Sequence, residues 1–69
     1  MHQEHDVVML TQPLSALGLP PGALGVVVHV HGQGVAYEVE FMRDDGCTLG
    51  LQTLRADQLR KATPALKSS

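Results

Sequence analysis

The chain has 69 residues, of which 43% are hydrophobic and 17% charged, and its formal net charge is −2. This length excludes two domains and a large enzyme pocket, because a chain of this size buries only about 60% of the surface that it exposes when unfolded. The single cysteine excludes an internal disulfide, and neither a signal peptide nor a membrane-spanning apolar stretch is visible, so we expect a cytoplasmic protein.

Alternation of apolar and polar residues predicts an all-β fold. Strands are expected at residues 6–11, 25–31, 35–42 and 47–53. The segment 12–24 is a long loop, in which Pro21-Gly22 fits the centre of a type II turn. Three leucines in this loop are expected to pack against the core, because an exposed loop would not carry them: Leu14, Leu17 and Leu19.

Turn chemistry sets the expected registers. A two-residue loop at Gln33-Gly34 fixes the pairing of the second and third strands. On the inner face the expected cross-strand pairs are Val30 with Tyr37, Val28 with Val39, and Val26 with Phe41. On the outer face they are His29 with Glu38 and Val27 with Glu40. A three-residue loop, Asp44-Asp45-Gly46, joins the next pair of strands, with Gly46 in the left-handed conformation. The expected inner face carries nine side chains: Val26, Val28, Val30, Val35, Tyr37, Val39, Phe41, Leu49 and Leu51.

The segment after Leu54 has two interpretations. Residues 55–58 suit a single 3₁₀ turn followed by a short closing strand at 59–62, whereas the alternative is one helix over 55–62. We favour the turn and strand, which gives a barrel domain at 6–62 between a flexible N-terminus (1–5) and a flexible tail (63–69). The order of elements is typical of a small, partly open SH3-like barrel of about five short strands.

Several strings resemble one small bacterial family: DVV at 6–8, GLPPG at 18–22, GVVV at 25–28 and YEVEF at 37–41. The similarity continues through Asp45-Gly46, Thr48 and Thr53-Leu54 to Leu59, and spans residues 6–60. The family is domain of unknown function 4926. A more distant similarity, to KOW-type and other SH3-like barrels, rests on the Gly-x-x-Gly-x-Val pattern of residues 22–27. The resemblance implies the barrel but no catalytic residues, and some members lie beside toxin-like genes or on mobile elements, which would suit an antitoxin, immunity or adaptor role.

One strand face concentrates the candidate site residues. His29 and His31 are expected on the outer face of one strand, beside Glu38 and Glu40 of the next. This pattern predicts a surface for a protein partner. A Zn²⁺ or Ni²⁺ site that also uses the N-terminal histidines is the alternative, but no cysteine joins the cluster and the spacing of structural zinc sites is absent. We therefore expect neither a metal nor a cofactor.

Charge is divided between the two parts of the chain: residues 1–54 hold six acids and one base, and residues 55–69 hold four bases and one acid. The acidic part favours a basic protein partner. The alternative is a KOW-like nucleic-acid or ribonucleoprotein binder that uses Arg55, Arg60 and Lys61. The acidic net charge and the lack of exposed aromatic residues disfavour it. Since no catalytic motif surrounds Cys47 or any other nucleophile, we expect no enzyme activity.

The first strand is apolar on both faces, although a strand with one buried face should alternate. Either the leucine-rich loop covers its second face, or a second subunit of a homodimer does.

Overall fold

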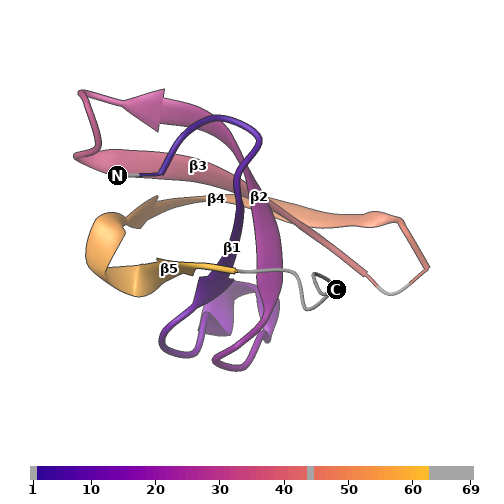
Figure 1. Ribbon diagram of the computed structural model, residues 1–69. Coiled ribbons are helices and arrows are strands. Elements are labelled where there is room, and N and C mark those ends of the chain that lie inside the picture. Colours follow the sequence, from indigo (N-terminus) through magenta and orange to yellow (C-terminus); the bar gives the residue numbers. More distant parts are fainter. Residues whose placement is uncertain (1, 44, 63–69) are drawn as a thin grey trace, which may run out of the picture.

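The structure, a computed structural model, describes residues 2–43 and 45–62. Its strands form one antiparallel sheet in the order β4-β3-β2-β1-β5 (Figure 1). The strand bounds are β1 Val7–Leu10, β2 Leu24–His31, β3 Ala36–Met42, β4 Thr48–Arg55 and β5 Leu59–Lys61. Two 3₁₀ turns complete the elements, η1 at Ser15–Leu17 and η2 at Ala56–Gln58. Within the described ranges no helix is long and apolar enough to cross a membrane.

This architecture confirms the predicted all-β class and the five short strands. The turn-and-strand interpretation of residues 55–62 is also correct, because η2 is followed directly by β5. The turn η1 in the long loop was not anticipated. Asp44 and the predicted tail at 63–69 lie outside the described residues. The sheet is not closed, since β4 and β5 are its two edges.

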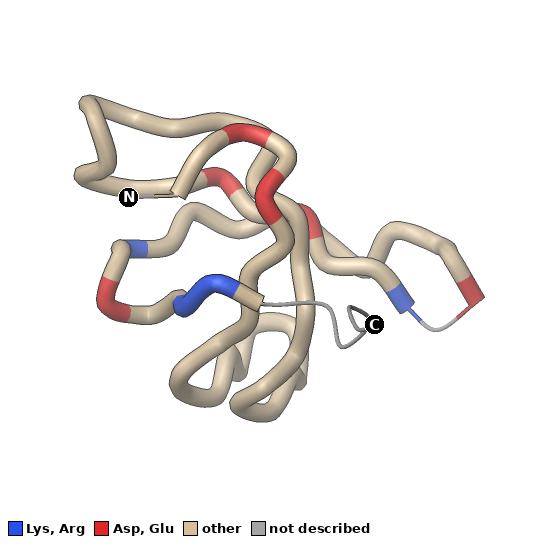
Figure 2. Tube along the Cα trace, in the orientation of Figure 1, with Lys and Arg blue, Asp and Glu red and all other residues tan. Residues whose placement is uncertain are grey.

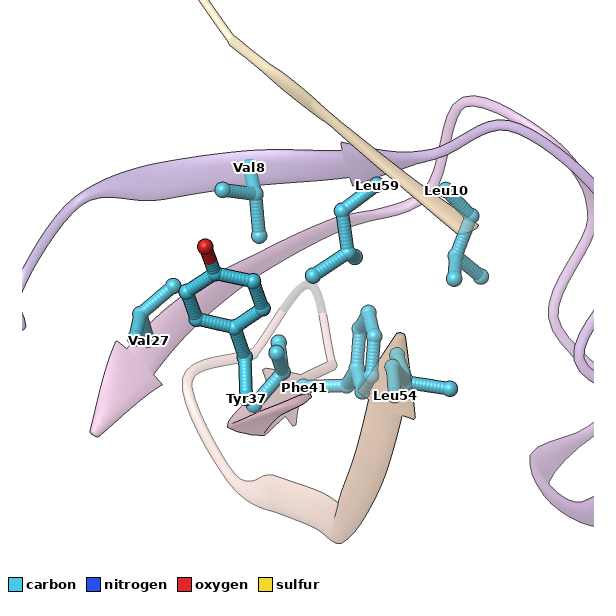
Figure 3. Close-up of a cluster of buried hydrophobic side chains, with 8 residues drawn as sticks. Val8, Leu10, Val27, Tyr37, Phe41, Leu54 and Leu59 are labelled. Atoms are coloured by element: carbon cyan, nitrogen blue, oxygen red, sulfur yellow. The ribbon is translucent and has the colours of Figure 1, made fainter. Parts of the chain in front are cut away.

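The core lies between the two ends of the curved sheet. Figure 1 shows β2 bending along its length, which brings β1 and β5 across from β3 and β4. Side chains from both sides point toward one another in Figure 3, with Tyr37 and Phe41 as the largest fully buried side chains. The core cluster consists of Val8, Leu10, Val27, Tyr37, Val39, Phe41, Leu54 and Leu59.

The register of β2 with β3 agrees with the prediction only on one side of a bulge. Val30 lies opposite Tyr37 and His29 opposite Glu38, as expected. The register then shifts by one residue between Val27 and His29, so that Val27 lies opposite Val39, Val26 opposite Glu40 and Gly25 opposite Phe41. Because an extra residue reverses the side-chain alternation, Val27 is fully buried and Val28 is 39% exposed. The expected pairings of Val28 with Val39, Val26 with Phe41 and Val27 with Glu40 are therefore wrong.

A second bulge has the same effect on β4. The predicted turn is present at its end, since Gly46 has a φ of 90° and the Arg43 N–H donates to the Cys47 carbonyl at 2.8 Å. Thr48 lies opposite Met42, but the register shifts by one residue before Gly50, which lies opposite Phe41. Leu54 therefore enters the core, whereas Leu51, expected inside, is 54% exposed. Val35 was also expected inside, but it lies in the β2–β3 turn and is 73% exposed.

The long loop packs against the core, as predicted. Leu14, Leu17 and Leu19 are partly buried against the core cluster. Leu17 lies over Gly50 of β4, on the inner side of the sheet, where a Cβ at position 50 would come within 2.8 Å of its Cδ2 atom. The loop leaves the outer face of β1 partly uncovered, because Val7 remains 39% exposed.

The segment before β1 runs along β2 next to the bulge. The Val27 N–H donates to the carbonyl of Asp6 at 2.9 Å, and the His5 N–H donates to the carbonyl of Val27 at 2.6 Å. Further on, the His2 N–H donates to the buried Tyr37 hydroxyl at 3.2 Å. These contacts bring the N-terminal residues beside the histidine-bearing half of β2.

Candidate functional site

The four residues predicted for a partner surface lie on the outer face of β2 and β3. His29 lies opposite Glu38 and His31 opposite Ala36, and the two imidazole rings are in edge contact with centroids 4.6 Å apart. Glu40 lies on the same face, opposite Val26 on one side and Leu51 on the other. The structure thus brings His29, His31 and Glu38 into one cluster and places Glu40 one step further along β3.

Glu38 is the centre of the polar contacts in this cluster. Its Oε2 atom lies 3.4 Å from Nε2 of His31 and accepts a hydrogen bond from the Thr53 hydroxyl at 3.0 Å. His29 lies opposite Glu38, as predicted, but the side-chain contact with Glu38 is made by the diagonal neighbour His31. Both side chains are partly exposed, so the pair adds little to stability.

Three residues that sequence reasoning missed complete this face. Nδ1 of His29 lies 3.9 Å from Oε2 of Glu4, which the N-terminal segment brings to β2. Thr53 and Thr48 of β4 bind Glu38 and Glu40, respectively, each at 3.0 Å. Nothing local in the sequence placed Glu4, whereas the threonines could have been found only with the correct β3–β4 register.

Metal binding has little support from this arrangement. Within residues 2–43 and 45–62, no group of three or more histidine, cysteine, aspartate or glutamate side chains is close enough to hold an ion. A zinc site needs at least three such protein ligands around one point. His29 and His31 provide two imidazoles, but their carboxylate neighbours lie on opposite sides of the pair.

An apolar groove lies next to Glu40. It has a volume of about 500 Å³, and its walls come from β1, β2, the end of β3 and the long loop. Leu24 and Met42 in these walls are 54% and 50% exposed. Val26 joins the groove to the carboxylates, because it lines the groove and is the direct cross-strand neighbour of Glu40. The lining residues are Val7, Leu19, Ala23, Leu24, Gly25, Val26, Phe41 and Met42.

The residues of the nucleic-acid alternative lie on the two edge strands. Arg55 ends β4, and its Nε atom donates to the carboxylate of Asp57 at 3.1 Å. Arg60 and Lys61 belong to β5, opposite Met9 and Val8 of β1. Figure 2 shows these bases apart from the acidic residues of the N-terminal segment and β3. Residues 1–42 contain no lysine or arginine at all, so β1, β2 and β3 carry no permanent positive charge on their side chains.

Comparison with known proteins identifies a family. The family model with the description "Domain of unknown function (DUF4926)" matches residues 4–61, which include all five strands. No curated protein matches the chain. No solved structure matches it either.

Proposed function

The chain belongs to the DUF4926 family, and we propose that it is a non-enzymatic protein-interaction module that binds a segment carrying both basic and aliphatic side chains. The binding surface is the outer face of β1, β2 and β3, which we name the acidic–apolar face. It comprises His29, His31, Glu38, Glu40, Glu4, the exposed groove residues Val7, Leu24 and Met42, and the partly buried Val26. In the cell, the protein acts in the cytoplasm as an antitoxin, immunity or adaptor component.

One observation supports this proposal above the others: the apolar groove and the carboxylates meet at Val26 and Glu40, which are direct cross-strand neighbours. If the partner inserts an aliphatic side chain into the groove, a lysine or arginine next to it in the partner's sequence can reach Glu40. Interface cores are depleted of charge and rims are polar, and this face has the same arrangement on a small scale.

The charge distribution favours a basic partner. Glu4, Glu38 and Glu40 lie on or beside strands that have no lysine or arginine. Complementary charge raises association rates and selects partners more than it adds affinity. Binding through this face should therefore weaken as salt concentration rises.

A capture experiment with matched baits tests the proposal. The wild-type chain, the Glu38→Lys/Glu40→Lys variant and the Leu24→Ser variant are immobilised separately and exposed to lysate from the source cell. The control bait is Asp57→Lys, which reverses a charge in η2, away from the acidic–apolar face. We expect the wild-type and control baits to capture a protein that neither the Glu38→Lys/Glu40→Lys bait nor the Leu24→Ser bait captures.

Measurement of the association rate of the captured protein then tests whether the acidic–apolar face is the binding surface. For the captured protein, charge reversal at Glu38 and Glu40 should slow association, and the wild-type association rate should fall with salt. An association rate that depends neither on salt nor on these substitutions contradicts the proposed binding face. Capture of the same proteins by all of the baits also contradicts it.

The nucleic-acid alternative is tested by filter binding at low salt, with single-stranded RNA and duplex DNA as probes. Retention that disappears in an Arg55→Ala/Arg60→Ala/Lys61→Ala variant would favour it over a protein partner. The acidic net charge and the burial of both Tyr37 and Phe41 argue for no retention.

A further inference from the structure

The two edges of the sheet differ in how they are protected. β5 has three residues, two of which are Arg60 and Lys61. β4 has eight residues, and the stretch Thr48–Leu54 contains neither a charged residue nor a proline. Short length, basic residues and prolines are the usual means by which proteins prevent an edge strand from pairing with another chain. β5 has two of these features. β4 has none of them before Arg55, and the bulge before Gly50 interrupts only its start, which leaves residues 50–55 as a regular edge.

The edge of β4 also offers a complete row of backbone groups. In the described part of the chain, β4 pairs only with β3, so every second residue of the strand presents its unpaired N–H and C=O groups on the other side. Leu51, in the middle of the strand, is 54% exposed. A second strand of equal length could therefore extend the sheet, with about one inter-chain hydrogen bond for each residue paired.

We propose that β4 pairs antiparallel with β4 of a second copy of this chain, forming a two-fold symmetric dimer with one continuous sheet. Two conditions fix the register. First, residues directly opposite each other must lie on the same face of the sheet, so the residue numbers of each opposite pair must add to an even number. Second, the two strands overlap fully only when the two-fold axis passes through their centre. Both are met when Gln52 lies at the two-fold axis and Leu51 lies opposite the partner's Thr53.

Gln52 suits a position on the axis. Its side chain is half-buried, and an amide carries both donors and an acceptor, so two copies of it can hydrogen-bond to each other reciprocally. A glutamate or lysine at this point would instead meet a like charge. The strand centre is thus self-complementary, which favours a second copy over an unrelated strand.

The ends of the paired strands are complementary in charge. In this register, with the bulge before Gly50 counted, Arg55 of one copy lies beside Thr48 of the other. The Thr48 hydroxyl already donates to Glu40 at 3.0 Å, so the arginine of the partner arrives next to that carboxylate. The Arg55 side chain is 66% exposed, and its contact with Asp57 uses only the Nε donor, which leaves the rest of the guanidinium for a second carboxylate.

The same contact cannot form within one chain. Glu40 lies opposite Leu51, and Arg55 lies opposite Ala36, four residues further along β3. At about 3.3 Å for each residue, the backbone positions of Glu40 and Arg55 are separated by roughly 13 Å along the strand direction. A functional link between Arg55 and Glu40 would therefore report on the dimer. Both proposals use Glu40, but the dimer concerns a strand edge and is tested without any other protein, so either proposal can fail alone.

Charge exchange in trans tests the dimer. The dissociation constant of the full chain is measured by sedimentation equilibrium for the wild type, Arg55→Glu and Glu40→Arg. Each substitution places like charges at both symmetric contacts, and we expect each to raise the dissociation constant by about tenfold, or roughly 1.4 kcal/mol. An equimolar mixture of the two variants should restore wild-type affinity, because each copy then supplies the charge that the other lacks. The matched control is Arg60→Glu, which changes the charge of the other edge and should leave the dissociation constant unchanged.

A measurement on the unmodified chain guards against variants that fail to fold. Amide hydrogen exchange in β4 should slow as protein concentration rises, while exchange in β5 stays constant. A chain that is monomeric at every concentration overturns the proposal. It is also overturned by a mixture of the variants that associates no better than either alone, or by oligomers larger than two, which would indicate pairing of β4 with β5.

Discussion

Gly25 lies directly opposite Phe41 in the β2–β3 ladder, and the space where its side chain would be is filled by the Phe41 ring. A Cβ at position 25 would come within 2.6 Å of Cγ1 of Val39 and 2.9 Å of the ring. Both of those side chains are almost fully buried, so neither can move aside without disturbing the core.

We therefore expect Gly25→Ala to lower the free energy of unfolding by about 1–3 kcal/mol, the usual cost of overpacking a core. Gly50→Ala is the matched comparison, because a Cβ there meets the end of the Leu17 side chain in the long loop, which can shift. Urea unfolding of both variants gives the two values. Equal losses, or a larger loss at Gly50, would contradict this account of the packing.

Neighbouring positions on β1 should respond very differently to a charge. Val8 is fully buried in the core, whereas Val7 is 39% exposed on the outer face. Val8→Lys would bury a charged ammonium group in the core, where it has neither a partner nor water, so we expect it to abolish folding of a domain of this size. Val7→Lys should change the thermal midpoint only slightly. Circular dichroism during heating distinguishes the two, and a folded Val8→Lys protein would show that the inner face of β1 has been misassigned.

The turn η2 begins with a side-chain contact that can be removed alone. The Arg55 N–H donates to Oε1 of Gln58 at 2.8 Å, which satisfies a backbone group that the turn leaves free. We expect Gln58→Ala to cost about 0.5–1.5 kcal/mol, as for other single hydrogen bonds. Asp57→Ala removes only the exposed ion pair with Arg55 and should cost less than about 0.5 kcal/mol. Chemical denaturation of both variants provides the comparison, and the reverse order would show that the ion pair stabilises the turn.

The paired imidazoles of His29 and His31 should not form a zinc site. Their rings are in edge contact, and the described residues contain no group of three side chains that could hold an ion. We expect titration calorimetry with Zn²⁺ to give no heat at micromolar concentrations. The control is a His29→Ala/His31→Ala variant, and a difference between it and the wild type would revive the metal interpretation.

The sequence was informative wherever a turn fixed the register and no residue was inserted. The Gly46 turn and the pairing of Val30 with Tyr37 were predicted correctly. The β2–β3 connection has four residues, 32–35, and not the expected two, but the alternation of side chains gives the same register. Beyond each bulge the same reasoning placed the wrong residues inside. Val27 and Leu54 were missed for this reason, since a bulge in a run of valines or leucines leaves the apolar pattern readable in either register.

The candidate site was predictable in part for the same reason. His29, His31 and Glu38 lie between the β2 bulge and the turn, where the register was predicted correctly, so their common face was correct as well. Glu4 was not predictable, because its contact with His29 depends on how the N-terminal segment crosses β2. The groove was hidden as well, since it requires Val26 on the outer face, and the expected register placed that residue inside.

The pairing of β1 with β5 also determines when this chain can fold. Leu10 of the first strand lies opposite Leu59 of the last, and both belong to the core. A ribosome must therefore synthesise nearly the whole sheet before its first strand acquires a neighbour on that side. Contacts so distant in sequence favour slow, all-or-none folding after synthesis over stepwise folding during it. Until then the apolar residues of β1 remain exposed to whatever binds nascent chains.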